Sequence, residues 1–277
     1  MWCERIDSLN DPRVAQYRNV PDPELLRAHG VFIAEGRQVV RSLLTDSPFG
    51  VRSVLVSEAA LEGLRDVLER RDDFPVYLST SDELAAIVGF NLHRGCLAIG
   101  QRPSMRSHRE VLGAASRWRL LVIGESIGNA DNMGGIFRNA ASFGAGAVLL
   151  SPGCCDPLYR KAIRVSVGAS LRIPFGTVSN WPDGLADVKA AGYTIVALTP
   201  DAACPDLMEV CGREAWPGRI ALVVGHEGGG LTEEALAASD LRVRLAMQPG
   251  VDSVNVATAA GIALYVCARR WSGIVQE

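Results

Sequence analysis

The sequence is poor in the features that mark secreted, membrane-spanning or metal-binding chains. Its seven cysteines, an odd number, include no C-x-x-C pair, so neither a zinc site nor a disulfide framework is predicted. The longest apolar stretches are strand-sized, and Gly144 and Gly146 break the one at 139–151, which argues against a membrane span. Charges at Glu4 and Arg5 come too early for a secretory signal. We therefore expect a reduced, cytoplasmic protein without a metal.

Lysine is also scarce, since only Lys161 and Lys189 occur and arginine supplies nearly all the positive charge. The net charge of −3 argues against a broadly positive surface. Two runs nevertheless hold arginines and no acid, Leu84–Arg109 and Pro157–Pro182. A guanidinium group matches phosphate geometry with two parallel hydrogen bonds. The charge pattern therefore permits an anionic partner without requiring one.

The 277 residues, 48% hydrophobic and 21% charged, are enough for two globular domains of roughly 150 residues each. Residues 1–105 alternate strand-like and helix-like segments, which predicts a compact α/β domain, and residues 106–118 read as a linker. In residues 119–277 strands alternate with helices, which predicts a mostly parallel sheet. The expected strands are Leu120–Gly124, Ala147–Ser151, Arg172–Phe175, Thr194–Leu198, Ile220–Val224 and Leu241–Leu245. The expected helices are Met133–Phe143, Leu158–Val167, Asp183–Ala191, Thr232–Ala238 and Val254–Arg270.

Three segments interrupt this plain pattern, each after a strand end, where open α/β sheets bind ligands. In the first, at 124–144, Asp131 or Asn132 is expected to cap the helix. Gly134 and Gly135 in its first turn cost about 1 kcal/mol each relative to alanine, which a ligand or a backbone lying against the helix would offset. Arg138 shares the face of Gly134, so this helix start could hold a phosphate or could simply pack.

The second segment, 222–236, is a glycine-rich loop between a buried strand and a helix. It contains no Walker signature, and Glu227 stands where a dinucleotide-binding G-x-G-x-x-G loop needs glycine. A carboxylate there suits a ribose or a sulfonium better than a pyrophosphate. In the third segment, 245–266, we expect Asp252 or Ser253 to cap a final helix rich in small residues. Read alone, this segment also fits close packing without chemistry.

Taken together, the three segments carry motifs in a fixed order: N-x-G-x-x-x-R at Asn132–Arg138, G-x-E-x-x-G at Gly225–Gly230, and S-x-N at Ser253–Asn255. In order and spacing they resemble the three motifs of the SpoU (TrmH-like) RNA 2′-O-methyltransferases of the SPOUT superfamily. VFIAEGRQVVRSLL (31–44) and RGCLAIG (94–100) are similar to the substrate-binding domain that often precedes the catalytic domain. The resemblance extends over nearly the whole chain.

The resemblance implies a C-terminal SPOUT domain with a mostly parallel sheet and a deep trefoil knot, which periodicity would not have suggested. It also implies S-adenosylmethionine as methyl donor, the 2′-hydroxyl of rRNA or tRNA as acceptor, and a homodimer. The implied polar catalytic residues are Asn132, Arg138, Glu227, Ser253 and Asn255. The implied donor-binding residues are Leu198, Thr199, Gly225, Gly230, Leu245, Met247 and Val254. The arginines expected to contact RNA are Arg94, Arg160 and Arg164.

Some positions depart from the family pattern. His226 stands where many members have Asn or Ser, Val254 where Leu is commoner, and Ala246 where Pro is usual. Arg94 lies where Gln is frequent, which weakens the expectation for RNA contacts there. Two other functions remain open. A nicotinamide-dependent oxidoreductase would need a G-x-G-x-x-G fingerprint that neither loop provides, and a non-catalytic RNA-binding protein would be expected to have lost the polar residues, which are all present.

Overall fold

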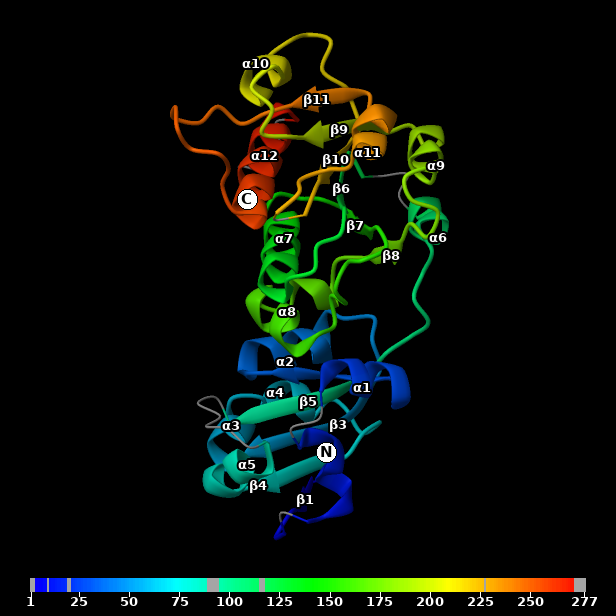
Figure 1. Ribbon diagram of the computed structural model, residues 1–277. Coiled ribbons are helices and arrows are strands. Elements are labelled where there is room, and N and C mark those ends of the chain that lie inside the picture. Colours follow the sequence, from blue (N-terminus) through cyan, green and yellow to red (C-terminus); the bar gives the residue numbers. More distant parts are fainter. Residues whose placement is uncertain are drawn as a thin grey trace. The chain divides into compact units, whose positions relative to one another are not determined.

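The computed structural model describes residues 3–8, 10–18, 21–88, 95–114, 118–226 and 228–271, which form two compact units (Figure 1). Unit 1 is Met1–Ser104 with Pro157–Arg172, and unit 2 is Met105–Asp156 with Ile173–Glu277. Both are α/β, as the sequence predicts. In the residues described, no helix is long and apolar enough to cross a membrane.

The described part of unit 1 forms a five-stranded sheet in the order β1-β4-β3-β5-β2. Strands β1, β4 and β3 pair in parallel, and β5 is antiparallel to both β3 and β2. The strands are β1 (Cys3–Arg5), β2 (Val31–Glu35), β3 (Val51–Ser57), β4 (Val76–Ser79) and β5 (Cys96–Gln101). The helices from this part of the chain are η1 (Pro12–Tyr17), α1 (Asp22–Ala28), α2 (Arg37–Thr45), α3 (Glu58–Glu62), α4 (Arg65–Leu68) and α5 (Ser81–Val88).

The later segment 157–172 also belongs to unit 1, although the sequence-based boundaries place it in the C-terminal domain. It contains α8 (Arg160–Val165) and η2 (Ala169–Leu171). The Arg160 amide donates to Asp22 Oδ2 at 2.8 Å, and a Cβ on Gly168 would lie 3.3 Å from Ser42 Cβ. Contacts across more than a hundred residues set this boundary, and local pattern does not reveal them.

Unit 2 is built on a sheet whose order in the described residues is β11-β9-β10-β6-β7-β8, with every ladder parallel. Every residue of β6, β7 and β10 is buried, as expected of parallel strands covered on both faces. The bounds of β6, β9 and β10 match the prediction, whereas the strand expected at 172–175 starts three residues later. The strands are β6 (Leu120–Gly124), β7 (Ala147–Leu150), β8 (Phe175–Thr177), β9 (Thr194–Leu198), β10 (Ile220–Val224) and β11 (Leu241–Val243).

The segment predicted as a linker, 106–118, holds a helix that is fastened to unit 2. His108 Nε2 lies 2.7 Å from Asp187 Oδ2, and Arg109 Nε donates to the same oxygen at 2.8 Å. Hydrogen bonds from Arg109 and His108 hold the pKa of the Asp187 carboxyl below its ordinary value. The described helices of unit 2 are α6 (His108–Gly113), α7 (Ala130–Ser142), α9 (Leu185–Ala190), α10 (Leu207–Cys211), α11 (Glu233–Ala238) and α12 (Val256–Arg270).

Helices α7 and α12 lie side by side (Figure 1) and approach closely. A Cβ on Gly135 would lie 2.7 Å from Ala257 Cβ, and Asn139 Nδ2 donates to the Ala257 carbonyl at 2.7 Å. Gly135, which lies in the second turn of α7, is therefore explained by a neighbouring helix. Neither a ligand nor a phosphate is needed to account for it.

Both helices begin at caps other than those expected. Asn129 caps α7, accepting from the Asp131 and Asn132 amides, so the expected caps Asp131 and Asn132 lie inside the helix. Asn255 caps α12, where Asp252 or Ser253 was expected. Several Asx and Ser residues near each helix start can all cap, and the packing of α7 against α12 decides among them.

Replacing Gly135 by alanine should destabilise unit 2, because the added methyl must push the two helices apart. We expect the free energy of unfolding to fall by about 1–3 kcal/mol, the usual cost of overpacking. Gly113→Ala is the matched control, since a Cβ there meets nothing within 4 Å and alanine favours helix. Chemical denaturation of both variants checks this, and a Gly135→Ala variant that is more stable than the parent, as alanine's helix propensity alone would make it, would contradict the close contact.

Candidate active site

A pocket of about 580 Å³ opens in unit 2 at the carboxyl ends of β9 and β10. Its walls come from the loops that follow these strands, from the segment after β11, and from the first turn of α12. This is the edge at which open α/β sheets bind ligands. The lining includes all the residues for which the family resemblance implies donor binding: Leu198, Thr199, Gly225, Gly230, Leu245, Met247 and Val254.

The glycine-rich loop after β10 is a tight turn closed by its own backbone. The His226 amide donates to the Gly230 carbonyl at 3.1 Å, and the Gly230 amide donates back at 3.0 Å. A Cβ on Gly225 would lie 2.3 Å from the Gly230 carbonyl carbon, and Gly230 has a φ of +69°. Glycine is therefore required at both positions for the chain to close the turn. Glu227 lies outside the described residues.

Two of the predicted catalytic residues, Asn132 and Asn255, are hydrogen-bonded to each other. Asn255 Nδ2 donates to Asn132 Oδ1 at 2.7 Å, while Asn255 Oδ1 accepts from the Ala257 and Thr258 amides at 2.9 and 3.2 Å. Asn132 is buried on α7, and Asn255 lines the pocket beside Ser253. The first and third sequence motifs therefore meet at one wall of the pocket.

Arg138 is exposed on α7 and is not part of the pocket lining. Its guanidinium group forms no hydrogen bond or ion pair with any residue that the structure describes. The side chain is thus available to a group from outside this chain.

The arginines predicted to contact RNA differ in their surroundings. Arg94 lies outside the described residues. Arg160 Nε and Nη2 are buried, which places that guanidinium poorly for a nucleic acid. Arg164 Nη1 lies 3.8 Å from Glu35 Oε2, with 53% of the Arg164 side chain exposed. Of the two described arginines, Arg164 is the better placed to reach a phosphate.

Glu125, which the sequence reading did not single out, is a buried carboxylate at the end of β6. Its Oε1 accepts from Trp181 Nε1 at 2.6 Å and from Thr232 Oγ1 at 2.7 Å, and its Oε2 accepts from the Thr232 amide at 3.0 Å. Thr232 is the N-cap of α11 and ends the glycine-rich loop. An acid directly after a buried strand could mark Glu125 as a candidate functional residue from the sequence. Its partner Thr232, however, lies 107 residues away in the chain, and local pattern does not reveal that contact.

Comparison with known proteins assigns the chain to a family through its C-terminal residues. The model of the SpoU rRNA methylase family matches residues 119–265. An uncharacterized tRNA/rRNA methyltransferase of Mycobacterium tuberculosis is 39% identical over 263 residues, 92% of this chain and 88% of that protein. The 23S rRNA (guanosine(2553)-2′-O)-methyltransferase RlmP of Bacillus subtilis is 24% identical over 95% of this chain and 98% of its own.

Solved structures share the fold over nearly the full length. The AdoMet-bound rRNA methyltransferase from Sinorhizobium meliloti matches with a TM-score of 0.81 and 22% identity over 98% of both chains. The SpoU methyltransferase AviRb from Streptomyces viridochromogenes, in complex with AdoMet, matches with a TM-score of 0.77 and 23% identity over 95% of this chain and 100% of that chain.

Substituting Glu125 by glutamine should loosen the end of the glycine-rich loop. Glutamine has one acceptor oxygen and one NH₂ group, so it cannot accept from Trp181 and from both Thr232 donors. A buried donor left without an acceptor costs about 1–3 kcal/mol. Adding Trp181→Phe removes the conflicting donor, because the glutamine NH₂ can then face Thr232 Oγ1.

The Glu125→Gln variant should therefore unfold at lower denaturant concentration than the parent. Relative to Trp181→Phe alone, the same glutamine substitution should cost clearly less, which a double-mutant cycle of unfolding free energies measures. Strictly additive losses would show that the Trp181–Glu125 bond is not the reason for a carboxylate at this position.

Proposed function

Because the chain belongs to the SpoU rRNA methylase family and is an S-adenosylmethionine-dependent RNA 2′-O-methyltransferase, we propose that the pocket beside β9 and β10 holds the donor. The acceptor is a ribose 2′-hydroxyl of rRNA or tRNA. One observation carries this assignment: the seven residues that the family resemblance implies for the donor all line a single pocket, together with Ser253 and Asn255.

The pocket suits this donor in size and chemistry. Its volume of about 580 Å³ lies within the range of small-molecule sites, roughly 300–1,000 Å³. Leu198, Leu245 and Met247 offer apolar surface, while Glu233 and Asp252 add negative charge to the lining. Carboxylates favour a cationic ligand through Coulomb attraction. When bound, the donor supplies an electrophilic methyl group on a sulfonium.

Asn132 and Asn255 position one wall of the pocket. Their hydrogen bond of 2.7 Å fixes the start of α12, where Ser253, Val254 and Asn255 form part of the pocket wall. Methyl transfer is in-line, so the acceptor oxygen must be held on a defined line toward the methyl carbon. Positioning of this kind can supply several kcal/mol of the barrier reduction. The hydrogen bond between Asn132 of α7 and Asn255, the N-cap of α12, holds the pocket wall in place and so provides this positioning.

Arg138 binds the phosphate that adjoins the acceptor ribose. A guanidinium stays protonated in proteins, so Arg138 cannot serve as the base that takes the hydroxyl proton. It stabilises the alkoxide that develops on the acceptor oxygen, and the neighbouring phosphate or a water takes the proton. The exposed position of Arg138 and its lack of partners among the described residues support this role.

The active form is a homodimer that buries the outer face of α12. Ile262 and Tyr265 are each 45% exposed on this helix, and the Tyr265 ring meets Phe143 edge-on at 5.8 Å between ring centroids. Apolar side chains gathered on one exposed helix face favour a second copy as the occupant. A neighbouring subunit could also bring its own Arg138 toward the first subunit's site.

The remaining assignments follow from the same family. Residues 1–105 serve as the RNA substrate-binding domain, with Arg164 of unit 1 as an additional contact. The C-terminal segment is threaded as a trefoil knot, and the enzyme acts in the cytoplasm on rRNA or tRNA. Binding of RNA should depend strongly on salt, because it rests on arginine–phosphate contacts.

Mapping 2′-O-methylated nucleotides in total RNA tests the function. Cells that lack the gene should lose methylation at a defined position, and the purified protein with S-adenosylmethionine should restore it on RNA from those cells. An unchanged methylation map, with no methyl incorporation in vitro, would contradict the proposal.

Arg138→Ala should abolish methyl transfer while leaving the affinity for the donor unchanged, because Arg138 does not line the pocket. Arg138→Lys should keep part of the activity, since an ammonium still attracts phosphate but lacks the two-pronged geometry. Single-turnover rates and donor titration separate the two effects. Full loss of transfer in Arg138→Lys, with RNA and donor still bound, would argue against a phosphate-binding role.

The proposed dimer face can be tested by placing a charged side chain on it. Ile262→Asp should shift the protein from dimer to monomer in sedimentation velocity, because a carboxylate would be buried without a partner. Met208→Asp is the matched control, since Met208 is an exposed apolar residue on α10. A wild-type protein that sediments as a monomer at all concentrations would contradict the dimer.

A further inference from the structure

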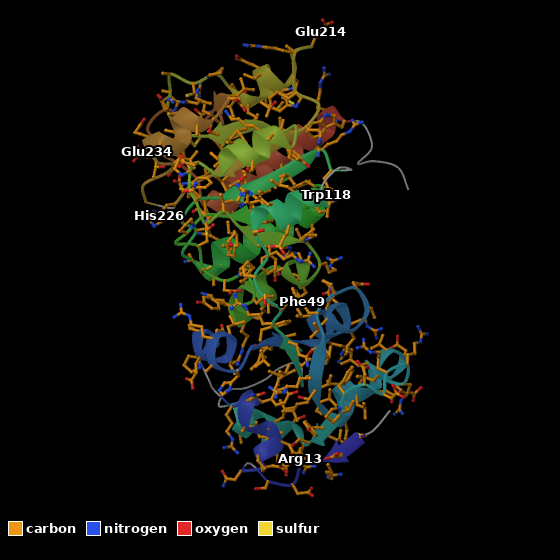
Figure 2. The ribbon with its side chains drawn as sticks, turned by 90° about the vertical axis from the view of Figure 1, so that its right-hand side faces the viewer. Arg13, Phe49, Trp118, Glu214, His226 and Glu234 are labelled. Carbon is orange, nitrogen blue, oxygen red and sulfur yellow. The ribbon has the colours of Figure 1, made fainter. Side chains whose placement is uncertain are left out.

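The imidazole of His226 is hydrogen-bonded to the inside of the glycine-rich loop. Its Nδ1 accepts from the Gly228 amide at 2.9 Å and from the Gly229 amide at 3.3 Å. The His226–Gly230 backbone pair closes the same turn, and Figure 2 labels His226 on this part of unit 2. The side chain thus satisfies two amides that the turn itself leaves open.

This arrangement requires an Nδ1 without a proton. An imidazole nitrogen that accepts a hydrogen bond cannot carry hydrogen, and in the charged ring both nitrogens are donors. Protonation of His226 therefore replaces attraction by repulsion between Nδ1–H and the two amides. Consecutive glycines lose much conformational freedom when ordered, so the imidazole adds to the His226–Gly230 backbone pair by holding the Gly228 and Gly229 amides in place.

We propose that His226 is a positioning residue whose neutral imidazole shapes the donor-binding loop, so that affinity for S-adenosylmethionine falls as the ring is protonated. The inference rests on the proposed function of the pocket, which His226 lines with Gly228 and Gly229. Asparagine can replace histidine at this position. Its Oδ1 is attached to Cγ, as Nδ1 is in histidine, and can accept from the same two amides. An amide oxygen accepts hydrogen bonds without titrating near neutral pH.

Other charged groups face the same pocket. Glu233 of α11 and Asp252 of the segment before α12 belong to its lining, and Glu227, next in the chain, lies outside the described residues. Carboxyl groups ordinarily titrate near pH ~4, whereas histidine is the side chain that ordinarily changes charge between about pH 5 and 8. Comparing His226 with asparagine at two pH values isolates the imidazole from these groups and from the donor's own amine.

The test is calorimetric titration of S-adenosylmethionine into the full-length protein at pH 7.5 and pH 5.5. His226→Ala should bind about tenfold more weakly at pH 7.5, the effect of losing two modest hydrogen bonds, and His226→Asn should recover most of that loss. On going to pH 5.5, the wild type should lose several-fold more affinity than His226→Asn. His29→Ala, at an exposed histidine after α1, should match the wild type at both pH values.

Three outcomes overturn the inference. Equal affinity of His226→Ala and wild type at pH 7.5 would show that the loop does not need the imidazole. An equal loss at pH 5.5 in wild type and His226→Asn would assign the pH response to another group. Wild-type protein that binds no donor at either pH would remove the proposed pocket function, and the inference with it. If His226→Ala fails to fold, the comparison of donor affinity between wild type and His226→Asn at pH 7.5 and pH 5.5 tests the inference by itself.

Discussion

The hydrogen bond between Asn132 and Asn255 is the interaction on which the site depends. It joins segments 123 residues apart and sets where α12 begins, because the other side of the Asn255 amide caps that helix. The pocket wall formed by Ser253 and Val254 follows from this starting point. Close contacts of Gly135 with Ala257 and of Gly261 with Asn139 then pack α7 against the first half of α12.

The second part of the site is a loop shaped by its own main chain and by the side chains of His226 and Glu125. Gly225 and Gly230 allow the backbone to cross itself closely, and Glu125 holds the end of the loop through Thr232. The loop contributes Gly225, Gly228, Gly229 and Gly230 to the pocket lining, so much of what it presents there is main chain. The proposed donor would therefore meet main-chain groups of this loop, while the exposed Arg138, which is not part of the pocket lining, would face the RNA.

Much of unit 2 could be predicted from the sequence. The bounds of β6, β9 and β10 were correct because buried parallel strands form continuous apolar runs with sharp ends. The helix caps were wrong, since Asn129, Asp131 and Asn132 are equally able to cap and only tertiary packing selects among them. The placement of 157–172 in unit 1 and the role of Glu125 depend on partners far away in the chain. The residues proposed to bind the donor were named through family resemblance, because spacing alone also allowed a packed helix, and the structure places them in the lining of one pocket.

We propose that one pocket at the ends of β9 and β10 holds the methyl donor. Hydrogen–deuterium exchange of the purified protein with and without S-adenosylmethionine tests it most directly. We expect slower exchange in peptides that cover 198–200, 224–231 and 245–256, and no change in peptides from β3 and α4. Protection that is absent from these three segments, or that appears only in unit 1, would contradict it.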